Sequence, residues 1–75
     1  MNATTQIDAR RLGCPLPILH TRKALAALAS GDTLEVTATD PGSMKDMDAF
    51  CRQTGHALLE AREQAGEYVF LIRKR

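Results

Sequence analysis

The amino-acid sequence predicts an α+β fold of order βαβαββ, with four strands in one sheet and two helices packed on one face of it. Three observations lead to this prediction. Residues 33–39 alternate between apolar and polar side chains, as a half-buried strand does. Residues 14–30 and 43–54 each carry an apolar stripe at helical spacing. Residues 56–72 contain two short segments separated by a glycine, which favours a pair of strands.

Length and composition limit the class of protein. A chain of 75 residues suits a single domain, taken here as residues 1–75. Apolar residues make up 44% of the chain and charged residues 25%, so a globular protein is expected rather than a disordered one. The net charge of +1 does not point to a nucleic acid or an acidic membrane as partner.

The location expected from the sequence is the cytoplasm. The stretch from Met1 to Ala9 is polar and has no apolar core of a signal peptide. No apolar run approaches the length needed to cross a bilayer, so no membrane partner is expected. Two cysteines in such a chain favour free thiols over a disulfide.

The first helix is predicted from Cys14 to Ser30, after a short strand at residues 5–9, with Gly31 at the position where helices commonly end. Leu16 and Leu19 fall outside its apolar stripe when successive residues are placed about 100° apart. We therefore expect both leucines to be exposed beside the cysteine. The stripe itself contains Ile18, Leu25 and Leu28.

The second strand and second helix are joined by the turn Asp40-Pro41-Gly42. Ser43 followed by Asp46 resembles a capping box in which Asp replaces the usual Glu, so the helix is expected to start there. Gly55 ends it. The apolar stripe of this helix, interpreted as core rather than as a metal site, contains Met44, Met47, Phe50 and Cys51.

The segment from His56 to Ala65 is ambiguous. Its leucine, alanine, glutamate and arginine content favours a helix by propensity. Residues 68–72, however, form a plain strand that needs a neighbour. A hairpin of two closing strands is therefore the more economical interpretation.

Three polar features are interpreted as solvent-exposed. The basic end Arg73–Arg75 is taken as a solvated tail, with partner docking or RNA contact as alternatives. His20 and His56 are also taken as solvated. His20 is not expected to act as a base for Cys14, because it lies about 9 Å further along the helix axis.

The cysteines and histidines show no structural zinc spacing, and no cofactor is expected.

Cys14 lies in the most informative segment, Leu12-Gly13-Cys14-Pro15-Leu16-Pro17. A residue before proline avoids the helical region, whereas proline suits a first helical turn, so Cys14 is expected at the helix start. The partial positive charge there favours an anion, and thiolate is the nucleophilic form of cysteine. Because Pro17 has no N–H, the amides of Leu16 and Ile18 are the expected donors to the sulfur.

No second cysteine stands where a Cys-x-x-Cys motif would place it. A resolving thiol there would attack a persulfide and eject its sulfur, which Pro17 cannot do. Cys51, on an apolar stripe, is interpreted as a buried small hydrophobe. A thiol redox protein remains an alternative that would need Cys51 within disulfide range of Cys14.

The chain resembles the TusA/SirA family from Ile7 onward. The family's Cys-Pro-x-Pro motif is matched at Cys14-Pro15-Leu16-Pro17. The resemblance continues through Arg22-Lys23, Gly31–Leu34, Thr39–Ser43, Asp48–Cys51 and Phe70–Lys74.

This resemblance implies a two-layer sandwich with both helices on one face of a mixed sheet, and it makes His56–Ala65 a strand. It implies that Cys14 accepts sulfur as a persulfide from a cysteine desulfurase or rhodanese-like protein and passes it to an acceptor protein. Such a carrier takes part stoichiometrically and is not a stand-alone enzyme. Use of the sulfur varies in the family between 2-thiouridine formation in tRNA, molybdenum-cofactor supply and sulfur oxidation.

The resemblance also assigns positions to a site. Gly13, Pro15 and Pro17 are expected to shape the surroundings of Cys14, with Gly13 leaving room for a partner. The Arg10-Arg11 pair is expected to help hold a persulfide anion or an acidic partner. A monomer is expected, because successive partners must reach the thiol. The docking residues are expected to be Leu16, Leu19, Arg22, Lys23 and Asp40.

An alternative interpretation is an RNA-binding or regulatory interaction module without thiol chemistry. The fold is similar to an RNA-binding domain of a translation initiation factor. Two observations argue against an RNA-binding module. The net charge is near neutral, and the chain has only one tyrosine and two phenylalanines, which offer no evident platform for stacking bases. Direct contact with nucleic acid is therefore not expected.

Overall fold

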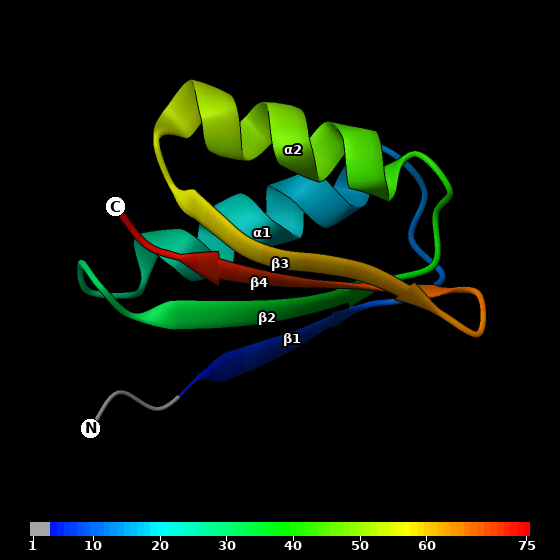
Figure 1. Cartoon of the computed structure of the whole chain (residues 1–75), viewed down its shortest axis with the longest axis horizontal. Helices are drawn as coiled ribbons and strands as arrows, with labels where there is room; N and C mark the ends of the chain where they lie inside the picture. Colours follow the sequence, from blue (N-terminus) through cyan, green and yellow to red (C-terminus); the bar gives the residue numbers. More distant parts are fainter. Residues whose placement is uncertain (1–3) are drawn as a thin grey trace.

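The elements follow one another in the predicted order in the computed structural model, which describes residues 4–75 (Figure 1). The first three residues of the polar stretch Met1–Ala9 lie outside the described part. Neither helix among residues 4–75 is long and apolar enough to cross a membrane. The elements are β1 (Thr5–Ala9), α1 (Leu16–Ala26), β2 (Thr33–Ala38), α2 (Ser43–Thr54), β3 (Ala57–Gln64) and β4 (Glu67–Arg73).

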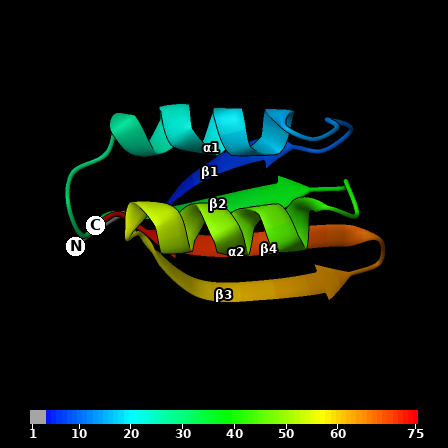
Figure 2. The same ribbon diagram turned by 90° about the horizontal axis from the view of Figure 1, so that it is seen from above.

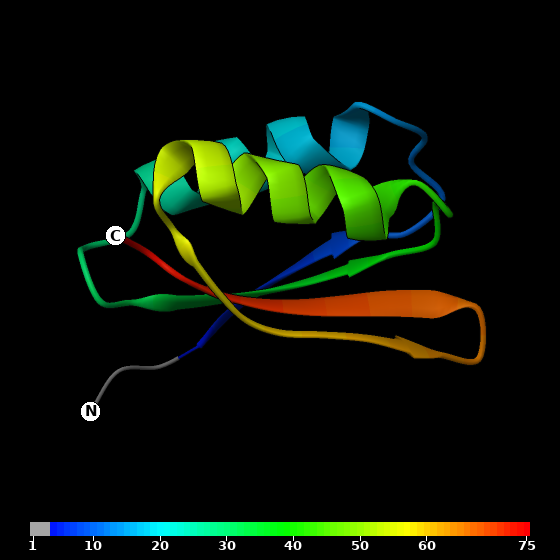
Figure 3. The ribbon, with the colours of Figure 1, turned by 45° about the horizontal axis from the view of Figure 1, so that its top comes forward.

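The sheet is mixed, with the strand order β1-β2-β4-β3. β1 runs parallel to β2, and β4 runs antiparallel to both of its neighbours. Parallel strands need a crossover connection, which α1 provides between β1 and β2. α1 packs on β1 and β2, α2 packs on β3 and β4, and both helices cover the same face of the sheet (Figures 2 and 3). The predicted two-layer sandwich is confirmed.

The two ends of the described chain lie at the same end of the sheet. Thr5 pairs with Leu34, and Arg73 pairs with Thr33. The loop that precedes α1 follows the other end of β1, after Ala9. β1 therefore begins, and β4 finishes, at the opposite end of the molecule from the start of α1 (Figure 1).

The core lies between the helices and the central strands β2 and β4. Leu34, Val36 and Ala38 of β2 are fully buried, which confirms the predicted alternation. Phe70 and Ile72, which pair with β2 across the ladder, are also fully buried. α2 adds Met47, Phe50 and Cys51 from the predicted stripe, and Met44 packs at its edge.

α1 is shorter than the predicted helix, spanning Leu16–Ala26 rather than Cys14–Ser30. The amide of Ala27 donates to the carbonyl of Ala24 (3.2 Å), so the last turn tightens before the chain leaves the helix. Gly31 therefore lies in the following loop instead of ending the helix.

The buried row of α1 also differs from the predicted stripe. It consists of Pro17, Thr21 and Leu25, spaced four residues apart, whereas Ile18 and Leu28 are only partly buried. Thr21 can be buried because its hydroxyl donates to the carbonyl oxygen of Pro17 (2.8 Å).

The predicted capping box at the start of α2 is wrong. Ser43 is the first helical residue, and Gly42 occupies the N-cap position. The hydroxyl of Ser43 is buried (the residue is 1% exposed) and has no hydrogen-bond partner among residues 4–75. The turn is instead held by Asp40, whose carboxylate accepts from the amide of Gly42 (3.1 Å). Gly55 ends α2 with a left-handed φ of 83°, as predicted.

The hairpin interpretation of the C-terminal segment is confirmed. β3 and β4 pair in antiparallel fashion through a turn at Ala65 and Gly66, both with positive φ (52° and 80°). Positive φ at both central residues is the backbone that two-residue hairpins favour. A register shift between Leu58 and Glu60 interrupts the pairing, and Leu59 between them is 47% exposed.

The basic end is not a solvated tail. The Lys74 ammonium donates to the carbonyl oxygen of Leu28 (2.7 Å), and the Arg75 guanidinium donates to that of Thr54 (3.3 Å). His56 is not fully solvated either: it is partly buried, and its Nδ1 accepts from the amide of Arg75 (3.1 Å). Arg73 and Arg75 are exposed as predicted, but the end of the chain is anchored because β4 runs into the loops that close the helices.

Candidate functional site

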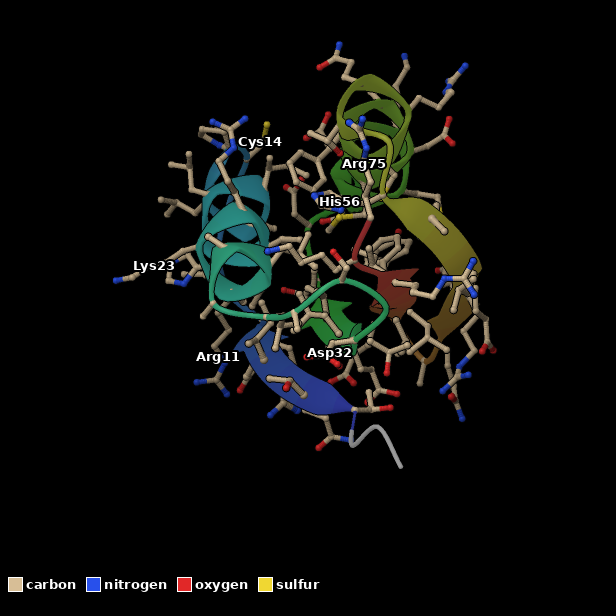
Figure 4. The ribbon with its side chains drawn as sticks, turned by 90° about the vertical axis from the view of Figure 1, so that its left-hand side faces the viewer. Arg11, Cys14, Lys23, Asp32, His56 and Arg75 are labelled. Carbon is tan, nitrogen blue, oxygen red and sulfur yellow. The ribbon has the colours of Figure 1, made fainter. Side chains whose placement is uncertain are left out.

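The two cysteines occupy contrasting positions. Cys14 is exposed in the loop directly before α1, where the Cys14–Pro15 peptide bond is cis, and Cys51 is buried in α2 with 3% of its surface exposed. Burial raises the pKa of Cys51 to about 11, with a smaller contribution from Asp48. Figure 4 shows the sulfur of Cys14 on the outer side of the helical layer, beside the trough between α1 and α2. Both thiols are free, so Cys14 is the reactive candidate.

The backbone amides that were expected to donate to the sulfur already donate to backbone carbonyl oxygens. The amide of Leu16 donates to the carbonyl oxygen of Gly13 (2.8 Å), and that of Ile18 donates to Pro15 (3.1 Å). Neither N–H is therefore left to hold a thiolate, and this part of the sequence prediction was wrong.

Two carboxylates from the start of α2 face Cys14 instead. The pKa of the Cys14 thiol is raised, chiefly by its interaction with the carboxylate of Asp46. Loss of solvation comes next, followed by the negative charges of Asp46 and Asp40. The site therefore favours the protonated thiol, which is the opposite of the predicted stabilisation of thiolate.

Sequence reasoning missed Asp46 as a site residue because it took this side chain for part of a capping box. The topology contained the signal. β1 and β2 are parallel, and each is followed by a helix on the same face of the sheet. The two helices therefore begin at the same edge, which places the first turn of α2 beside the loop that carries Cys14.

The residues expected to shape the site have different roles. Pro17 is buried in the core, whereas Pro15 is exposed and is the N-cap residue of α1. A Cβ added to Gly13 would meet no heavy atom within 4 Å. Nothing inside the chain requires a glycine there, and the open space is available to a partner.

The expected docking residues divide between two surfaces. Leu16 and Leu19 are exposed as predicted (42% and 49%), and together with His20 and Lys23 they line a hollow of about 250 Å³ on α1. Arg22 instead turns toward α2, its guanidinium carbon 5.9 Å from the ring centroid of Phe50. Asp40 lies across the trough, in the turn before α2. Figure 4 shows Lys23 pointing away from α2.

The Arg10-Arg11 pair does not support the sulfur. The guanidinium of Arg10 pairs with Asp8 (2.9 Å) and Glu67 (3.4 Å), and this contact lowers the pKa of Asp8 to about 2. Figure 4 shows Arg11 at the level of β1, whereas Cys14 lies above α1, on the opposite side of the helix. The predicted role of this pair in holding a persulfide anion is therefore wrong, whereas its docking of an acidic partner stays a prediction.

Candidate metal ligands do not gather in the described part of the chain. Among residues 4–75, no three histidine, cysteine, aspartate or glutamate side chains are arranged to hold a metal ion.

Comparison with known proteins places this arrangement in a family. Residues 5–74 match the family described as Sulfurtransferase TusA. The chain is 55% identical to the sulfur carrier protein TusA of Allochromatium vinosum, over 92% of this chain and 91% of that protein. It is 53% identical to a putative sulfur carrier protein of Neisseria meningitidis serogroup A, over 96% of each chain.

A solved structure agrees. The crystal structure of a SirA-like protein from Desulfitobacterium hafniense superimposes with a TM-score of 0.83 at 26% identity, covering 95% of this chain and 96% of that one. The family match and the identity to these relatives extend over almost the whole chain. The chain therefore belongs to the TusA family, the group indicated by the Cys14–Pro17 motif.

Proposed function

We propose that this protein is a sulfur carrier, which holds one sulfur atom as a persulfide on Cys14 and passes it from a donor protein to an acceptor protein. The observation that carries the proposal is the exposed Cys14 thiol at an open helix start, while the chain's second thiol is buried in the core. The relatives named as sulfur carrier proteins support the role. The proposed donor is a cysteine desulfurase or a rhodanese-like protein.

The chemistry needs no cofactor and no net redox change. In the first step the Cys14 proton passes to solvent, and the thiolate attacks the outer sulfur of the donor's persulfide. A sulfur–sulfur bond forms at Cys14 as the donor's sulfur–sulfur bond breaks, and the electron pair of that bond leaves with the donor's thiolate. In the second step the acceptor's thiolate attacks the outer sulfur, and Cys14 leaves as thiolate.

The raised pKa of Cys14 suits a carrier more than a catalyst of thiol exchange. A thiol of higher pKa leaves more slowly, so a persulfide on Cys14 resists random attack by other thiols. The negative charges of Asp46 and Asp40 also oppose the approach of anionic thiolates. A partner that places a cation beside Asp46 would remove both effects and permit transfer.

The acceptor is proposed to serve 2-thiouridine formation in tRNA, molybdenum-cofactor supply or sulfur oxidation. The same persulfide step at Cys14 serves each of these three uses. We also propose that the carrier works in the cytoplasm as a monomer and acts stoichiometrically.

The alternative of an RNA-binding module gains no support from the aromatic residues. Phe50 and Phe70 are buried, and Tyr68 is partly buried against the core. None of the three presents an open ring on which a base could stack.

Intact mass spectrometry tests the carrier proposal. The reduced protein is incubated with a cysteine desulfurase and L-cysteine, and wild type is compared with Cys14→Ser and Cys51→Ser. We expect wild type and Cys51→Ser to gain about 32 Da, one sulfur atom, and dithiothreitol to reverse the gain. Cys14→Ser gains nothing. If wild type gained no sulfur from this or other persulfide donors, the carrier function would be abandoned.

A further inference from the structure

A second surface feature lies between α1 and α2, toward their C-terminal ends. It is a groove of about 290 Å³ with a floor of apolar residues and a rim of basic ones, and we call it the basic groove. None of the residues that line it is acidic. The floor includes Leu25, Ala26 and Phe50, and the rim includes Arg22, His56 and Lys74.

The rim is built around the ring of Phe50. The guanidinium carbon of Arg22 and the ring of His56 each lie 5.9 Å from its centroid. Arg22 forms no ion pair with any carboxylate among residues 4–75. A positive charge therefore stands over an apolar surface without an internal counter-ion.

Lys74 lines the groove, and Arg75 adds a second cation at its edge, beside the lining residue Thr54. Each side chain donates to one carbonyl oxygen near a helix end, Lys74 to Leu28 and Arg75 to Thr54. An ammonium group has three donors and a guanidinium group five, so these contacts leave donors on both side chains for a ligand. The pKa of His56 is lowered, first by burial and then by the charges of Lys74 and Arg75. The fold thus concentrates positive charge here.

The helical layer carries opposite charges at its two ends. Asp46 and Asp40 lie near Cys14 where the two helices begin, and the basic groove lies toward their C-terminal ends. Figure 4 looks along the helices from the basic end and shows His56 between α1 and α2 and Arg75 in front of the end of α2, with Cys14 at the outer margin of the same layer. A chain segment lying along the two helices would meet both ends.

We propose that the basic groove binds an acidic segment of a sulfur-transfer partner, with a carboxylate against Arg22 and against Arg75 at the edge of the groove, and an apolar side chain on the groove floor. The inference rests on the proposed carrier function for the identity of the partner. The charge of the rim selects an anion, and the apolar floor favours a peptide side chain over a phosphate. RNA fits less well, because the chain's net charge is only +1 and the groove has room for one or two side chains.

The test is an NMR titration of the isotopically labelled full chain. The probe is an N-acetylated, C-amidated hexapeptide of alternating leucine and glutamate, and its control is the same peptide with glutamine in place of glutamate. We expect saturable shifts at His56 and Phe50 with the glutamate peptide alone. Arg22→Gln and Arg75→Gln should each weaken binding about tenfold, since a charge-assisted hydrogen bond is lost.

Arg73→Gln is the matched control, because it removes the same charge from an exposed residue of β4. Its neighbour Ile72 points into the core, so Arg73 lies on the opposite face of the sheet and its loss should leave binding unchanged. The proposal is overturned if the glutamate peptide gives no saturable shift. It is also overturned if the glutamine peptide, inorganic phosphate or an RNA oligonucleotide produces the same shifts at the same concentration.

Loading of Cys14 by inorganic polysulfide, followed by intact mass, separates this inference from the carrier function. Loading without peptide binding would reject the acidic partner segment and keep the carrier. Peptide binding without loading would support the groove and reject the carrier.

Discussion

Cys14, in the loop before α1, lies near Asp46 in the first turn of α2, and the carboxylate of Asp46 raises the pKa of the Cys14 thiol. The interaction joins the starts of the two helices. The carboxylate opposes ionisation of Cys14. The fraction of Cys14 present as thiolate in the free protein therefore depends more on α2 than on α1, the helix that follows the cysteine.

Asp46→Asn should lower the pKa of Cys14, because the negative charge that opposes the thiolate is lost. We expect alkylation by iodoacetamide at about pH 7.5 to become several-fold faster, since thiolate is the reacting form. The pH profile of the rate should move to lower pH. Asp48→Asn is the control, because Asp48 pairs with Arg52 and affects Cys51 rather than Cys14. An unchanged profile in Asp46→Asn would contradict this account.

Cys51 should stay unreactive while the protein is folded. Its burial and its pKa of about 11 both suppress thiolate, so Ellman's reagent should titrate one thiol in the native protein and two in guanidinium chloride. Cys51→Ala should load sulfur normally and lose about 1 kcal/mol of unfolding free energy in urea titrations. Rapid modification of Cys51 in the native state would show that the core opens there.

Leu19→Glu should slow sulfur loading from a donor protein and leave the free energy of unfolding within about 0.5 kcal/mol of wild type. The reason is that Leu19 is 49% exposed in the hollow on α1 and contributes apolar surface to docking. Leu59→Glu changes a leucine of similar exposure (47%) on β3 and should load at the wild-type rate. Equal loading rates for both variants and wild type would remove Leu19 from the docking surface.

Stability should fall as the pH drops from about 7.5 to about 5.5, in part through His56. The folded state lowers the pKa of His56 below its ordinary value of 6.5, so the unfolded chain binds the proton first. The stabilisation is therefore complete above about pH 6.5 and is lost as the pH falls through the lower folded-state pKa. Protonation of Nδ1 would also remove the acceptor for the Arg75 amide.

Urea midpoints at several pH values measure this effect. His56→Gln should flatten the pH dependence in this window, whereas His20→Gln, on the exposed face of α1, should keep the wild-type slope. A wild-type slope in His56→Gln would show that titrating groups other than His56 govern it.

The fold was predictable because its signals are local. The alternation of Leu34, Val36 and Ala38 and the glycine at position 55 each depend on a few neighbouring residues. The exposure of Leu16 and Leu19 followed from helical geometry alone.

The parts that sequence reasoning missed depend on residues far apart in the chain. The loop after α1 is held where the amide of Gly31 donates to the carbonyl oxygen of Lys74. Arg10 pairs with Glu67, on another strand, in addition to the nearby Asp8. The environment of Cys14 likewise comes from Asp46, on another helix. Propensity and periodicity carry no information about such contacts.

The placement of the chain ends has a consequence for how such a carrier can be built into larger proteins. β1 begins and β4 finishes at one end of a molecule 31 Å long, and Cys14 lies toward the other. A neighbouring domain or a tether joined at either terminus would leave the thiol free to visit successive active sites. We therefore expect a fusion at either end of this domain to leave Cys14 accessible.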